Sequence, residues 1–169
     1  MMAEITYQMV LSTVQTAGIL VGIAYYIMTL NYTRRNQEQT LKTRHATIYN
    51  QLMGPIVTPI GIKNLLLLQE TPFSNYEEWS KLTSRNPEYN EAWIWMCNIY
   101  ESAGINLIEG VANIDYFARH NPWWSADFWR QYKPIIYEMR KNRPRFYQNM
   151  EYAMDSLEKY LEEHPELSN

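Results

Sequence analysis

Cysteine and histidine are scarce in this sequence, and their scarcity excludes several kinds of site. A single cysteine, Cys97, rules out an intrachain disulfide framework and zinc sites built from several thiolates. The three histidines, His45, His120 and His164, lie far apart, and none has a partner at ligand spacing. The motifs HExxH, ExxH and GxGxxG are missing, as is the P-loop pattern, so neither a helical metal site nor a recognised phosphate-binding loop is predicted.

An excess of positive charge is missing as well. Fifteen Lys and Arg residues stand against eighteen Asp and Glu residues, giving a net charge of -3. This balance excludes a nucleic-acid binder held by bulk positive charge. Aromatic residues, in contrast, are abundant: they make up 14% of the chain, with six Trp and fourteen Tyr. A chain of 169 residues with this composition predicts a folded domain with its own core.

The longest gap in the charge pattern lies near the N-terminus. No formal charge occurs between residues 5 and 33, and Glu4 is the only charge before Arg34. Residues 9–30, MVLSTVQTAGILVGIAYYIMTL, would extend about 33 Å as a helix, which is enough to cross the ~30 Å hydrocarbon core of a bilayer. We therefore predict a transmembrane helix. Four tyrosines lie near its ends, as interfacial aromatics do: Tyr7, Tyr25, Tyr26 and Tyr32.

Two alternatives to an uncleaved membrane anchor stay open. Polar residues in the first half of the segment, among them Ser12, Thr13 and Thr16, also suit the core helix of a soluble protein. A cleaved signal peptide is the second alternative. The sequence lacks two features of such a peptide, a basic region before the apolar stretch and a small-residue cleavage site after it.

The basic residues that follow the apolar stretch predict an orientation. Because positive charge favours the cytoplasmic side, we expect the N-terminus outside and residues 34–169 in the cytoplasm of a single-pass cell-membrane protein. A reduced cysteine suits that compartment. We also expect four cations to contact the headgroups of the lipid bilayer: Arg34, Arg35, Lys42 and Arg44.

One face of the predicted span carries small and polar residues. Gly18 and Gly22 form a GxxxG pair, and helical spacing places Gln15 and Thr29 on the same face. Small residues allow helices to approach closely, and an amide can hydrogen-bond across the contact. We expect this face to bind a membrane-protein partner or a second copy of the chain. The alternative is that glycine is simply common in membrane helices.

Beyond the span, the pattern predicts helices throughout and an all-α fold. Residues 1–33 are expected to form the tail and transmembrane helix, 34–53 a juxtamembrane helical extension that ends at Gly54-Pro55, and 54–169 a helical domain. Within that domain we expect helices over residues 60–69, 74–83, 86–110 and a short turn from 113. A further helix capped by Ser125 would kink at Pro134, and a last one would open at Asn142 and Pro144.

The order of motifs resembles an uncharacterised family of small prokaryotic, often archaeal, single-span membrane proteins that is catalogued as a domain of unknown function. The similar segments are TAGILVGIAYYIMTL, NYTRRNQEQTLKTRH, IYESAGINLIEGVANIDYF, FWRQYKPIIYEMR and RPRFYQNMEYAM, and they extend from about residue 15 to residue 161. The resemblance implies a membrane anchor that carries a compact helical domain. It implies no activity and no cofactor. The residues that carry it besides the span are Glu101, Gly104, Asp115, Trp129, Tyr132, Lys133, Pro134 and Arg140.

One set of polar residues could form a site. Glu101 lies among apolar neighbours, and a partly buried carboxylate needs a cation, which Arg130 or Arg140 could supply. The set indicates a structural ion pair, a solvated helix face, or a small polar pocket for an anionic ligand. For Trp123 and Trp124 the sequence allows two interpretations: an exposed aromatic surface that contacts a partner or the membrane, or part of the core.

Together these features predict a non-enzymatic, membrane-anchored helical protein that works without a cofactor. It would act through protein contacts, as an accessory or scaffold subunit in the membrane. The alternative is a membrane-anchored ligand-sensing or signalling module with a small polar pocket.

Overall fold

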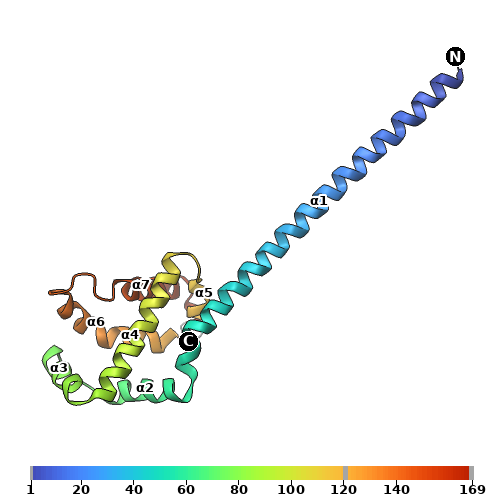
Figure 1. Cartoon of the computed structure of the whole chain (residues 1–169). Helices are drawn as coiled ribbons and strands as arrows, with labels where there is room; N and C mark the ends of the chain where they lie inside the picture. Colours follow the sequence, from blue (N-terminus) through green and yellow to red (C-terminus); the bar gives the residue numbers. More distant parts are fainter. Residues whose placement is uncertain (1, 120–121, 168–169) are drawn as a thin grey trace. The chain divides into compact units, whose positions relative to one another are not determined.

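The computed structural model describes residues 2–119 and 122–167, with side chains from residue 6 onward. The chain divides into two units, with the boundary between Thr43 and Arg44. Figure 1 shows the elements in sequence order, from the blue N-terminal helix to the red C-terminal one.

The first unit consists of the long N-terminal part of α1 (Met2–Met53). Every side chain described between residues 6 and 44 is exposed, including the apolar ones. The helix ends at Met53 because Gly54 and Pro55 follow, and a proline cannot continue the backbone hydrogen-bond ladder. This end is where the sequence predicts it.

The second unit is a helical domain. After a 3-10 turn, η1 (Gly54–Val57), come α2 (Pro59–Glu70), α3 (Tyr76–Arg85) and α4 (Pro87–Ile108), followed by α5 (Ile114–Ala118), α6 (Pro122–Arg140), α7 (Gln148–Glu163) and η2 (Pro165–Leu167). The described residues contain no strand. The predicted all-α fold, with a long apolar helix followed by a compact helical domain, is confirmed.

Side-chain caps set the start of several helices. Asn75, Asn86 and Asn113 each accept a hydrogen bond from a backbone N–H in the first turn of α3, α4 and α5, and Thr58 does the same for α2. Proline follows the cap at α2 and α4, where its missing N–H costs nothing. These starts could be read from the sequence because cap and helix are neighbours in the chain.

The helix α4 is central to the core and packs against α2, α3 and α7. Its buried residues include Tyr89, Trp93, Cys97 and Tyr100. The Tyr89 hydroxyl is hydrogen-bonded to the Tyr132 hydroxyl of α6 at 2.6 Å, so the two buried phenols satisfy each other. The rings of Trp79 and Trp93 meet edge to face, with centroids 4.7 Å apart.

Two predicted helix starts are wrong. The helix α6 begins at Pro122, and Ser125 is buried inside it, where its hydroxyl contacts the Tyr100 hydroxyl at 3.1 Å. The helix α7 begins only at Gln148, because residues 141–147 form turns that end in Tyr147 with a left-handed backbone (φ 50°). The helix α6 continues through Pro134.

Candidate functional site

The apolar surface of α1 is the largest candidate functional feature. The hydropathy of its most apolar 18-residue window averages 1.6, and none of that window is buried. By length and composition this helix could cross a bilayer, although a signal sequence passes the same test. In soluble proteins such a surface is normally covered.

The residues expected to form a helix contact lie open on this surface. Gln15, Gly18, Gly22 and Thr29 are exposed, and a Cβ added at either glycine would meet no atom within 4 Å. The Thr13 hydroxyl donates to the Met9 carbonyl at 2.8 Å, so this hydroxyl is satisfied within the helix, as the interior of a membrane requires.

The four cations expected near lipid headgroups are also exposed. Arg34 forms an ion pair with Glu38 one turn later, with Nε and Oε1 3.2 Å apart. An exposed pair of this kind contributes little to stability. The set comprises Arg34, Arg35, Lys42 and Arg44.

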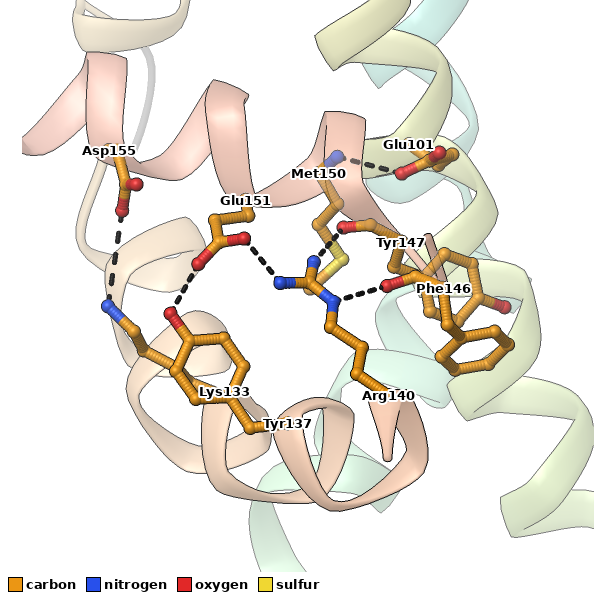
Figure 2. Close-up of polar contacts among 9 residues, drawn as sticks. All are labelled: Glu101, Lys133, Tyr137, Arg140, Phe146, Tyr147, Met150, Glu151 and Asp155. Carbon is orange, nitrogen blue, oxygen red and sulfur yellow. Dashed lines mark hydrogen bonds and ion pairs between the residues drawn. The ribbon is translucent and has the colours of Figure 1, made fainter. Parts of the chain in front are cut away.

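In the helical domain, Arg140 is the centre of a polar cluster that joins α6 to α7 (Figure 2). Its Nε donates to the Phe146 carbonyl at 2.7 Å and its Nη2 to the Tyr147 carbonyl at 2.9 Å. Its Nη1 forms an ion pair with Glu151, whose other oxygen accepts from the Tyr137 hydroxyl. One guanidinium therefore holds both the turn that precedes α7 and the first turn of α7 itself.

These contacts change the proton affinities of the two acids in the cluster. The hydrogen bond to Glu151 and burial raise the pKa of the Tyr137 phenol to about 12. Burial acts to raise the pKa of Glu151. The hydrogen bonds from Tyr137 and Arg140, together with the charge of Arg140, outweigh burial and leave that pKa below its usual value.

Glu101 has a different partner from the one its sequence context suggests. One carboxylate oxygen accepts from the Met150 backbone N–H at 2.8 Å and the other from the Asn149 side chain at 2.7 Å. Met150 lies in the first turn of α7, where backbone N–H groups have no partner within the helix. Glu101 therefore caps α7 from the neighbouring helix α4.

The expected pairing of Glu101 with Arg130 or Arg140 is thus wrong. Arg140 binds Glu151, and Arg130 pairs on an exposed surface with Asp127 of its own helix, at 2.8 Å. The sequence did not single out Tyr137, Glu151 or the carbonyls of residues 146 and 147. The spacing of Tyr137 and Arg140 on one face of α6 is the signal that could have drawn attention to this cluster.

The remaining candidates do not form a reactive site in the described part of the chain. Cys97 is fully buried, and burial raises the pKa of its thiol well above the usual value, so it is unreactive. His164 contacts Glu166 at 3.1 Å, while His120 lies outside the described residues. Within the ranges described, no group of three or more His, Cys, Asp or Glu side chains could hold a metal ion.

The two neighbouring tryptophans differ in their exposure to solvent. Trp123 is 51% exposed, whereas Trp124 is half-buried and packs against the core. Trp124 and Ser125 line a small cavity together with Tyr100 of α4 and apolar side chains from η1 and α2. The cavity measures about 20 Å³, room for about one water molecule. Tyr100 and Ser125 each bring a hydroxyl group to its lining, and burial raises the pKa of Tyr100 to about 12.

Fold and surfaces together define an all-α protein with a long, uncovered apolar helix at its N-terminus and a compact helical domain. Residues 12–156 match the family described as "Domain of unknown function (DUF4760)". This match includes most of the chain, so the chain belongs to that family, as the resemblance of its motifs implies. No curated protein and no solved structure matches it.

Proposed function

We propose that this chain is a non-enzymatic, single-pass membrane protein that acts as an accessory or scaffold subunit through protein contacts in the membrane. The observation that carries the proposal is the uncovered apolar surface of α1 between residues 6 and 30. At about 25 cal/mol per Å² of apolar surface removed from water, such a helix is far more stable in lipid than in solution.

The polar clusters of the helical domain support a non-enzymatic role. Arg140, Glu151 and Tyr137 bind one another, and Glu101 binds the N-terminus of α7. Each group therefore has a structural partner, and such pairs usually serve the fold.

The proposal includes an orientation and a partner surface. Arg34, Arg35, Lys42 and Arg44 would face the cytoplasmic leaflet, so that the N-terminus lies outside and the domain inside. The face with Gly18 and Gly22 would contact a membrane helix of a partner protein or of a second copy.

Gentle-detergent purification from native membranes, followed by native-gel sizing and mass spectrometry, tests this function. We expect a stoichiometric partner or a homo-oligomer. The variant Gly22→Leu should release that partner, because the larger side chain keeps the helices apart. The control variant Leu20→Phe enlarges the opposite face and should retain it. A monomeric chain that is extracted by carbonate alone would overturn the proposal.

Orientation is tested separately with cysteines placed on either side of the span. In intact cells an impermeant thiol reagent should label Ala3→Cys and should not label Ser84→Cys. The wild type, whose only cysteine, Cys97, is buried, serves as the unlabelled control. The opposite labelling pattern would reverse the orientation.

A second candidate function is ligand sensing, and the cavity beside Tyr100 and Ser125 is the observation that favours it. Its two buried hydroxyls share one hydrogen bond, which leaves one hydroxyl hydrogen to donate. A ligand hardly larger than water, with one acceptor, would fit this chemistry and this volume. Chemical shift changes that methanol causes in the wild type and not in Leu65→Phe, which fills the cavity, would support this function.

A further inference from the structure

The helix α2 carries apolar side chains on two sides. Gly61, Leu65 and Leu68 face the core, yet Ile60 is 72% exposed and Leu66 is 47% exposed. A helix on the surface of a soluble domain normally shows a polar outer face. The outer face of α2 also lines a shallow groove of about 450 Å³ that reaches Glu88 of α4.

The charges on this outer face are few and regularly placed. Lys63 and Glu70 are exposed and lie seven residues apart, so two helical turns place them on the same line, opposite the buried residues. Lys63 forms an ion pair with Glu88, whereas Glu70 has no ion partner in the part of the chain that the structure describes. The face therefore has apolar flanks, one cation toward its start and one unpaired carboxylate at its end.

We propose that the outer face of α2 binds the α2 face of a second copy of this chain in an antiparallel arrangement. A two-fold axis that passes between residues 66 and 67 places each Lys63 opposite the other copy's Glu70. The same axis brings the two Leu66 side chains together, and likewise the two Leu67 side chains. In this arrangement the face is complementary to itself in charge, as an isologous interface must be.

The size of the contact explains why it would form on a membrane. A stable dimer in solution usually buries about 800 Å² on each partner, which is more than one helix of this length offers. Anchoring two copies in one bilayer raises their effective concentration and makes a small contact sufficient. The inference thus rests on the proposed membrane anchor.

Oxidative cross-linking of the full chain in its native membranes tests the pairing. Leu66→Cys should give a disulfide-linked dimer, because the two-fold axis brings the two substituted positions together. Wild type, whose Cys97 is buried, and the exposed control Ser84→Cys on α3 should give only a background level. The proposal would be overturned if Leu66→Cys gave no more cross-linked dimer than Ser84→Cys does. It would also be overturned if Leu66→Cys were cross-linked to a foreign protein.

A charge-reversal cycle tests the register in the Leu66→Cys background. Lys63→Glu and Glu70→Lys each turn two attractive contacts into repulsive ones, and each should lower the cross-linked fraction about fivefold. The double reversal should restore it. Glu88→Gln removes the intrachain partner of Lys63 and should leave the cross-link intact, as should reversal of the Glu77–Lys81 pair on α3. A double reversal that gives no recovery contradicts the antiparallel register.

Carbonate extraction of the membrane fraction distinguishes the membrane-anchor proposal from the α2-pairing proposal. A chain that carbonate extracts refutes the anchor, whatever the cross-linking result. A chain that stays in the membrane without an α2-specific cross-link refutes only the pairing of α2.

Discussion

At the scale of single residues, the domain uses a carboxylate of one helix to satisfy a backbone group of another. Glu101 accepts from the Met150 N–H, a group that α7 cannot satisfy within its own first turn. The residue at the N-cap of α7, Tyr147, makes no side-chain cap, so the cap has to come from α4. A carboxylate in this place also interacts favourably with the helix dipole.

Replacing Glu101 by alanine should therefore destabilise the domain. Loss of the acceptor leaves the N–H of buried Met150 unsatisfied, which costs about 1–3 kcal/mol. Glu101→Gln keeps one acceptor oxygen and should cost less than half as much. Thermal unfolding followed by circular dichroism measures both. Equal melting temperatures for wild type and Glu101→Ala would show that the cap contributes nothing.

Glu151 makes stability depend on pH. Its folded pKa lies below its usual value of about 4.3, so the folded chain holds this proton less tightly than the unfolded chain does. The stabilisation is complete above the unfolded pKa, and it is lost as pH falls through the folded pKa. Denaturant unfolding between pH 6 and pH 3 should show this fall. It should be shallower for Glu151→Gln and unchanged for the control Glu158→Gln.

At the scale of elements, Gly104 sets how closely α4 and α7 approach. A Cβ at this position would lie 1.8 Å from the Asn149 backbone oxygen, which cannot rotate away as a side chain would. Gly104 and Glu101 lie on the same side of α4, so the close approach is also what lets the Glu101 carboxylate reach Met150. The helix contact and the cap depend on each other.

The variant Gly104→Ala should separate these two helices. We expect a loss of at least about 1–3 kcal/mol, the usual cost of overpacking a core, with the Glu101 cap lost as well. Gly54→Ala is the matched control, because nothing lies within 4 Å of its added Cβ. Chemical denaturation compares the two. A small and equal effect of both substitutions would mean that the close approach does not limit packing.

The elements also show which parts of the fold a sequence can predict. The starts of α3, α4 and α5 depend on caps next to each helix, so local sequence predicts them. The start of α7 follows Tyr147, whose backbone is left-handed, and the Arg140 guanidinium binds the carbonyls of Phe146 and Tyr147 in the turn before the helix. Sequence read locally places that start at Asn142 and Pro144, because it does not show which distant side chain binds a backbone carbonyl.

The same distinction applies to the candidate sites. The charge-free stretch and the basic residues after it are properties of composition, and the structure presents them as a continuous exposed helix. The partner of Glu101 is a backbone N–H of α7, and no residue type in the sequence marks such a donor. The sequence shows only the cations Arg130 and Arg140 as candidate partners, and the structure pairs both with other carboxylates.

At the scale of the whole molecule, the two units differ in how they place their apolar side chains. Residues 6–30 expose apolar side chains without burying any, whereas the second unit gathers many of its apolar side chains in one aromatic-rich core. A core of this kind, with its own caps and ion pairs, needs no contribution from the N-terminal unit. The division predicts that the units can be separated.

Residues 44–169, expressed alone, should fold in water without detergent. The reason is that the core of this unit, including Tyr49 and Met53 at the end of α1, is retained in full. We expect a cooperative unfolding transition and a helical circular dichroism spectrum. A fragment that begins at residue 54 is the control: it lacks Tyr49 and Met53, whose removal opens cavities worth about 2–5 kcal/mol each, and it should be less stable. If both fragments aggregate while the full chain is stable in detergent, the helical domain depends on the N-terminal unit for folding.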